Sequence, residues 1–190
     1  EDVNNLGGIQ GLPGFNTRLV IDAAQGGPEN IAGTSTITLT PQATAYNNMG
    51  VPGAKSFHLG FPGYGALNPY FARHATSPTA TVLGDAMSKN PTFFTNWIGA
   101  NDVLSYATNG GAQPDGVTPA ADHNVTGNIN PATYGMNDIT NSNVFANVYN
   151  TIVTTLTSGG AKGVVATIPS VTSIPYFTTV PYNALPAEAT

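Results

Sequence analysis

The strongest constraint on the fold is a helical pattern that lies between two apolar, strand-like runs. Apolar side chains recur along residues 143–157 at helical spacing, and Gly159 and Gly160 end the pattern. Residues 92–98 and 162–168 are short runs, rich in β-branched and aromatic residues and apolar on both faces. Such runs are typical of fully buried strands in a parallel sheet. The order strand, helix, strand predicts an α/β fold.

Further short elements are expected near the N-terminus. Residues 17–21 predict a strand that ends at the turn-forming residues 26–28. Residues 36–40 alternate between polar and apolar side chains, which predicts a half-buried strand and, with the first one, a β-hairpin. Residues 43–48 predict another short strand, which leads into a glycine-rich turn.

Helical patterns and one long polar segment account for most of the remaining chain. Residues 54–59, 68–75 and 78–89 are expected to begin or form helices. Residues 108–141 are rich in Gly, Asn, Asp and Pro and predict an irregular polar excursion. With 190 residues and no linker that divides them, the chain 1–190 is expected to be one domain.

The composition narrows the range of partners and settings. Only 8% of the residues are charged and the net charge is −5, so the chain lacks the basic surface that binds nucleic acid or anionic membranes. Neutral polar residues take the place of charge, which favours a secreted, periplasmic or cell-surface protein. The chain contains no cysteine, which excludes disulfides, thiolate metal sites and cysteine nucleophiles.

Several common catalytic and binding motifs are absent. The chain has no Gly-x-Ser-x-Gly nucleophile motif, no phosphate-binding loop and no His-Glu-x-x-His. The segment Asp122–Gly127 resembles the start of a calcium loop, but Thr133 stands where the closing bidentate Glu is needed. We therefore expect no metal and no cofactor.

Two turns carry the strongest functional signal. Gly53 lies in the glycine-rich turn that precedes the helix expected at 54–59, and Asn101 and Asp102 follow the apolar run at 92–98. A glycine N–H and an asparagine amide at such turns can donate hydrogen bonds to the oxyanion that forms during acyl transfer. The alternative is structural: Gly53 is a turn glycine, and Asn101 and Asp102 cap the following helix.

The two turns together resemble blocks of the SGNH (GDSL-type) hydrolase family. The segment Asn48-Met49-Gly50-Val51-Pro52-Gly53-Ala54 is similar to the second block of that family, and Gly99-Ala100-Asn101-Asp102 is similar to the third. Residues 55–59, 93–98 and 165–169 also resemble the secreted bacterial members. The resemblance extends from about residue 46 to residue 185.

The resemblance implies a flavodoxin-like three-layer α/β/α fold with a parallel sheet and serine-esterase chemistry. It assigns Gly53 and Asn101 as oxyanion donors and Asp102 as the residue that orients the loop at Asn101. In that family a serine in the first block attacks the ester, and an Asp-x-x-His in the fifth block activates it. The substrate would be a small-molecule, lipid or carbohydrate ester.

The chain departs from the family in its nucleophile and its base. No Gly-Asp-Ser precedes Gly53, and no Asp-x-x-His follows Asn101. We therefore expect an incomplete sheet in a central fragment, with the serine, histidine and aspartate supplied by the remaining N- and C-terminal portions of the same protein. The alternative is a non-catalytic extracellular module that binds a glycan or a protein through residues 109–141.

Overall fold

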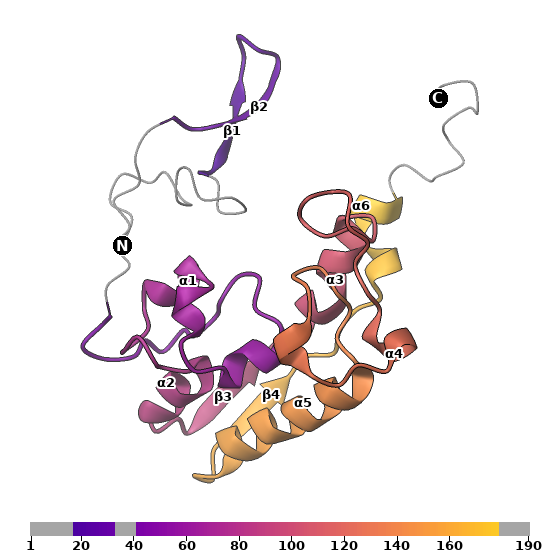
Figure 1. The fold of residues 1–190 in the computed structure, drawn as a ribbon. Helices are drawn as coiled ribbons and strands as arrows, with labels where there is room; N and C mark the ends of the chain where they lie inside the picture. The colour runs from indigo at the N-terminus through magenta and orange to yellow at the C-terminus, as the bar shows by residue number, and fades with distance from the viewer. Residues whose placement is uncertain (1–16, 33–40, 179–190) are drawn as a thin grey trace.

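The computed structural model describes residues 17–32 and 41–178, and it shows a mixed α/β protein (Figure 1). The described strands are β1 (Leu19–Asp22), β2 (Gly27–Asn30), β3 (Phe93–Asn96) and β4 (Lys162–Val165). The described α-helices are α1 (Pro69–Ala72), α2 (Val82–Ser88), α3 (Asn101–Thr108), α4 (His123–Thr126), α5 (Ser142–Thr157) and α6 (Pro175–Thr178). The described 3-10 helices are η1 (Ser56–Gly60), η2 (Tyr64–Ala66), η3 (Pro131–Thr133) and η4 (Val171–Ser173).

The predicted hairpin near the N-terminus is present, but its second strand differs from the prediction. β1 pairs with β2 in antiparallel register, from Leu19 opposite Asn30 to Asp22 opposite Gly27. The turn therefore precedes Gly27, and the glycine-proline pair expected in the turn lies in a strand instead. The predicted strand at 36–40 lies outside the described residues.

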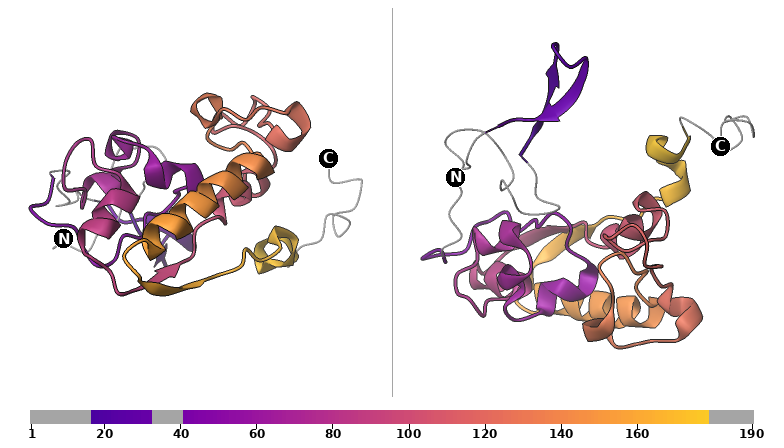
Figure 2. Two further views of the ribbon diagram at one scale, coloured as in Figure 1. Left: turned by 90° about the horizontal axis from the view of Figure 1, so that it is seen from below. Right: turned by 45° about the horizontal axis from the view of Figure 1, so that its top comes forward.

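The strand, helix, strand unit predicted from the sequence is confirmed. β3 and β4 pair in parallel, with Phe93 opposite Lys162 and Asn96 opposite Val165. α5 connects them and lies along one face of the two strands (Figures 1 and 2). Asn141 caps α5, because its side-chain oxygen accepts a hydrogen bond from the N–H of Asn143 at 2.9 Å.

The prediction that both strands are fully buried is wrong. Phe93 is 59% exposed, Trp97 is 76% exposed, and every residue of β4 is exposed. In the described part of the chain the sheet that contains β3 has two strands, so no further strand covers its sides. The sequence was apolar on both faces, but α5 covers only one of them.

Each predicted helical segment contains a helix, but 68–75 holds only the four residues of α1 and 78–89 the seven of α2, and 54–59 contributes to the 3-10 helix η1. Side-chain caps begin two of these helices: Asn68 accepts from the N–H groups of Tyr70 and Phe71, and Thr81 accepts from the N–H of Gly84. The main core cluster lies between the helices and 3-10 helices of this region and consists of Ala54, Tyr64, Phe71, Ala75 and Val82.

The strand predicted at 43–48 is wrong. Residues 43–48 form bends and irregular backbone instead. The Gln42 N–H donates to the carbonyl of Ala75, and the Asn48 side chain accepts from the N–H of Gly50. Side-chain bonds of this kind compete with a strand ladder.

The segment 108–141 contains two short helices, α4 and η3, and two isolated β-bridges. One bridge joins Asp122 to Ile139, which folds the segment back on itself. Among the described residues, no helix is both long enough and apolar enough to cross a membrane.

Candidate functional site

Gly53 lies in an exposed turn whose shape suits glycine. Its φ of +77° lies in the left-handed region, which side chains with a Cβ rarely adopt. The Asn68 amide stabilises this turn, since its Nδ2 donates to the Pro52 carbonyl at 2.9 Å and to the Tyr64 hydroxyl at 2.9 Å. The peptide group that carries the Gly53 N–H is therefore held by the buried side chain of Asn68, which lies 16 residues beyond Pro52.

Asn101 connects the end of β3 to the glycine turn. It is the first residue of α3, and its Nδ2 donates to the carbonyl of Ala54 at 2.9 Å. Ala54 directly follows Gly53, so the structure brings the two predicted oxyanion donors to neighbouring positions. An amide nitrogen carries two hydrogens, so this bond uses one of them.

Asp102 has a different role from the cap considered for it. Its carboxylate is buried, with 3% exposed, and accepts hydrogen bonds from the N–H and the hydroxyl of Ser56, both at 2.8 Å. Burial raises the pKa of Asp102, while the two bonds from Ser56 and the positive charge of Lys55 act in the opposite direction. The carboxylate therefore ties the start of α3 to η1.

Lys55 is an unusual buried cation beside this pair. It is 3% exposed, and its Nζ donates to the backbone carbonyl of Asp138. Burial lowers the pKa of Lys55, and the negative charges of Asp102 and Asp138 partly offset this effect. Lys55 thus attaches the segment 108–141 to the same turn that holds Gly53.

His58 is a partly buried histidine within η1. Its Nδ1 accepts a hydrogen bond from the N–H of Lys55 at 3.1 Å, and its ring stacks on Tyr64 with the centroids 4.4 Å apart. Burial lowers the pKa of His58 to about 4, and the Lys55 charge acts in the same direction. The imidazole is therefore neutral at pH 7.

A groove of about 1020 Å³ lies beside β3 and reaches Asn101. The groove is lined by residues 46–52, by Ala54 and by residues 91–101. Ile152 and Leu156 of α5 also line it. The groove connects the Asn101 end of the sheet to an open, mostly apolar surface.

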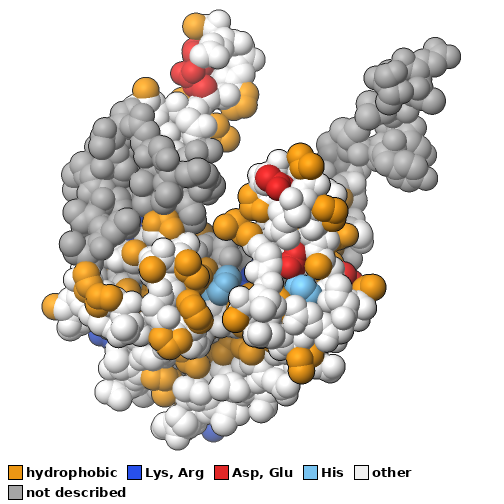
Figure 3. Space-filling model, in the orientation of Figure 1, with side chains coloured by type: hydrophobic (Ala, Val, Ile, Leu, Met, Phe, Trp, Pro, Cys, Tyr) orange, Lys and Arg blue, Asp and Glu red, His pale blue; other side chains and the backbone are white. Residues whose placement is uncertain are grey.

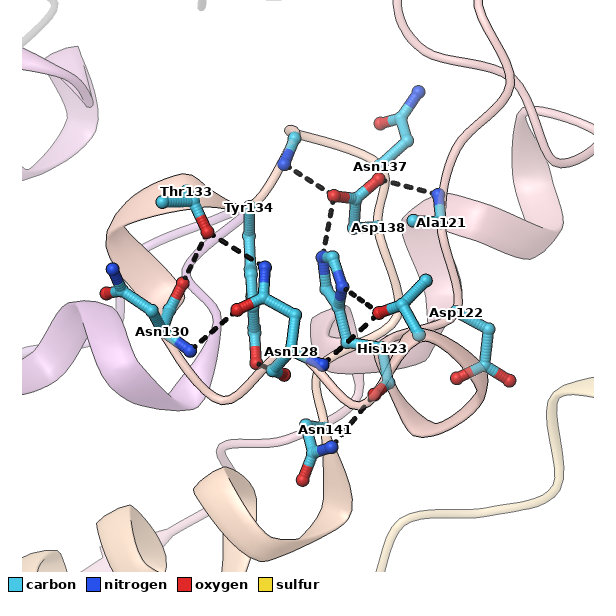
Figure 4. A network of polar contacts seen from close by, with 12 residues as sticks. Ala121, Asp122, His123, Asn128, Asn130, Thr133, Tyr134, Asn137, Asp138 and Asn141 are labelled. Carbon is cyan, nitrogen blue, oxygen red and sulfur yellow. Dashed lines mark hydrogen bonds and ion pairs between the residues drawn. The ribbon is translucent and has the colours of Figure 1, made fainter.

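A network of buried polar groups organises the segment 108–141 (Figure 4). At its centre, the carboxylate of Asp138 accepts from the N–H groups of Ala121 and Gly135, the Nε2 of His123 and the Nε2 of Gln113, at distances of 2.6–2.8 Å. Burial raises the pKa of Asp138, but these four hydrogen bonds outweigh it, so the pKa is lowered. The carboxylate is charged and anchors the loop.

His123 joins Asp138 to a hydroxyl group. Its Nδ1 lies 3.0 Å from the Thr126 hydroxyl, and its ring stacks on Tyr134 at 3.8 Å (Figure 4). The order hydroxyl, imidazole, carboxylate is that of a catalytic triad. However, His123 is only 5% exposed, and the three groups lie within the loop rather than at the groove. We assign this network to the stability of the loop.

The sequence predicted Gly53, Asn101 and Asp102, and the structure places all three around one turn. It also adds Lys55 and Ser56, which the sequence alone did not single out as site residues. Their partners are 46 residues away for Ser56 and 83 residues away for Lys55, and no local pattern carries that signal. Among the described residues no group of three potential ligands is arranged to hold a metal ion.

The chain was compared with known protein families, with curated proteins and with solved structures, and no match was found in any of the three.

Proposed function

We propose that this chain supplies the oxyanion side of a serine ester-hydrolase site of the SGNH type. The observation that carries the proposal is the hydrogen bond from the Asn101 amide to the carbonyl of Ala54. It joins the turn after β3 to the turn of Gly53, although the two turns are 47 residues apart in sequence. An oxyanion site needs preorganised donors that converge on one oxygen, and this bond brings the two candidate donors close together.

The chemistry follows from the two donors. When a nucleophile attacks an ester carbonyl, the carbonyl oxygen becomes negative, and preorganised N–H groups stabilise that charge. The Gly53 N–H and the second hydrogen of the Asn101 amide take this role. Asp102 acts as a positioning residue, because its bonds to Ser56 hold the first turn of α3 and hence Asn101.

In this proposal the nucleophile and its base are residues other than those named above. Ser56 is fully buried and bonded to Asp102, so it does not serve as the nucleophile. We place the serine and its Asp-x-x-His base in the remaining N- and C-terminal portions of the same protein, which would complete a flavodoxin-like α/β/α domain. The substrate class is a small-molecule, lipid or carbohydrate ester, and the setting is secreted, periplasmic or at the bacterial cell surface.

The test uses the chain alone and the chain within its whole protein, with p-nitrophenyl acetate as the substrate. The chain alone should not hydrolyse it. In the whole protein, Asn101→Ala should lower kcat about 10²–10³-fold with little change in KM. The exposed Asn109→Ala serves as the matched control. An inactive whole protein, or an Asn101→Ala variant with full kcat, would overturn the proposal.

A binding module remains the second candidate, because the segment 109–141 exposes apolar side chains. Val117, Val125, Ile129 and Met136 are each between 67% and 84% exposed. Hydrophobic side chains are dispersed over the visible surface of the molecule, with a few acidic side chains among them (Figure 3). An inactive whole protein that binds a glycan array, and loses binding in Val117→Ser, would favour this alternative.

A further inference from the structure

β3 uses one of its two edges in the described part of the chain. The Asn96 carbonyl accepts from the N–H of Ala166, on the β4 side, at 3.0 Å. In a parallel pair, alternate residues of a strand bond to the same neighbour. The N–H and C=O groups of Phe93, Thr95 and Trp97 therefore point toward the opposite edge, and all three residues are exposed.

The groove described above runs beside this second edge. α5 contributes Ile152 and Leu156 to it, and α2 contributes Val82, Leu83 and Ala86. Lys89 is the only charged residue among those that line the groove. The groove thus offers a row of strand hydrogen-bonding groups beside apolar walls.

An independent observation concerns the side chain of Asn96. This residue is 8% exposed and lines the groove, and its Nδ2 has no hydrogen-bond partner among the described residues. A buried amide donor without an acceptor is unfavourable, so such groups normally have a partner. A backbone carbonyl of a segment in the groove would supply the acceptor.

We infer that this groove binds an extended, uncharged polypeptide segment, which adds to β3 as a third strand. Strand addition gives hydrogen-bond partners to the N–H and C=O groups at the second edge of β3. Alternate apolar side chains of the segment contact α5 and α2. The segment also adds a strand to a sheet that has two strands in the described part of the chain, and two strands are marginal by themselves. The inference concerns the edge of β3 in this chain, and its test is separate from that of the proposed hydrolase function.

The experiment uses the full chain and a fluorescein-labelled peptide of sequence Val-Thr-Val-Thr-Val with a Gly-Ser-Lys tail. Fluorescence anisotropy should show saturable binding, and a peptide with proline at both Thr positions should bind at least tenfold more weakly. Amide hydrogen exchange, read by NMR, should slow at least tenfold at Thr95 and Trp97 when the peptide binds. Phe94 and Asn96 should already be protected in the free chain, because their N–H groups face β4.

Two variants separate binding from folding. Asn96→Leu removes the unpartnered amide and should weaken the peptide at least threefold while the chain remains folded. Asn150→Leu, on the exposed surface of α5, is the matched control and should not change the affinity. Absence of saturable binding, or binding without slower exchange at Thr95, would overturn the inference. Slow exchange at Thr95 in the free chain would also overturn it, whether it reflects a dimer or a segment of the same chain.

Discussion

The contact between Ser56 and Asp102 allows a quantitative test of what holds the candidate site together. Asp102→Ala removes a buried carboxylate that accepts from both the N–H and the hydroxyl of Ser56, and it removes the negative charge that acts most strongly on Lys55. Loss of one partner from a buried charged network costs about 3–5 kcal/mol. Ser56→Ala removes only the hydroxyl, and hydrogen bonds to charged groups are worth about 1.5–3 kcal/mol.

The double variant tests whether these two losses share one interaction. If the hydroxyl bond is real, the Ser56→Ala/Asp102→Ala variant should lose less free energy of unfolding than the two single losses added together, by about 1–2 kcal/mol. The measurement is urea denaturation at pH 7, followed by far-UV circular dichroism, because Trp97 is exposed and a poor reporter of folding. Strict additivity of the two losses would refute the reasoning.

Three further predictions test other parts of the structure by the same measurement. Gly99→Ala should cost at least about 2 kcal/mol, because the new Cβ would lie 2.5 Å from Ile168 and φ is +127°; Gly159→Ala is the control with open space. Ile152→Ala, in the buried face of α5, should cost about 2–5 kcal/mol. The pKa of His58 falls from 6.5 in the unfolded chain to about 4, so the folded state binds fewer protons and stability is lost as the pH falls through this window. Between pH 7 and pH 4.5 the free energy of unfolding should fall by about 1–2 kcal/mol after screening by solvent. This fall should be absent in His58→Phe.

The parts of the fold that the sequence predicts well are those with a local pattern. α5 was predictable because a single stripe of apolar residues and the glycines after Thr157 agree, and the structure adds the cap at Asn141. The positions of Gly53 and Asn101 were predictable as turns, because each follows or precedes a patterned segment. What the sequence could not reveal is the 2.9 Å contact that joins them, since it depends on packing between distant segments.

The burial of the strands shows where pattern alone is insufficient. An apolar run indicates that a strand prefers to be covered on both faces, but it does not state what covers it. In β3 the preference is met on the α5 side and unmet elsewhere, so Phe93 and Trp97 remain exposed. The pattern therefore predicts the strand itself, but not which elements lie against each of its faces.

The scarcity of charge makes the position of the remaining charges informative. The whole chain has five Lys or Arg and ten Asp or Glu, yet Lys55, Asp85, Asp102 and Asp138 are all engaged in its interior. A buried charge is tolerated only when it is paired or hydrogen-bonded, and each such group then fixes the geometry of its neighbours. Three of these four, Lys55, Asp102 and Asp138, interact electrostatically around Lys55, where they connect η1, α3 and the segment 108–141. Variants that disturb this cluster should therefore change the stability of the chain and the position of Asn101 together, whereas variants in the surface of α5 should change neither.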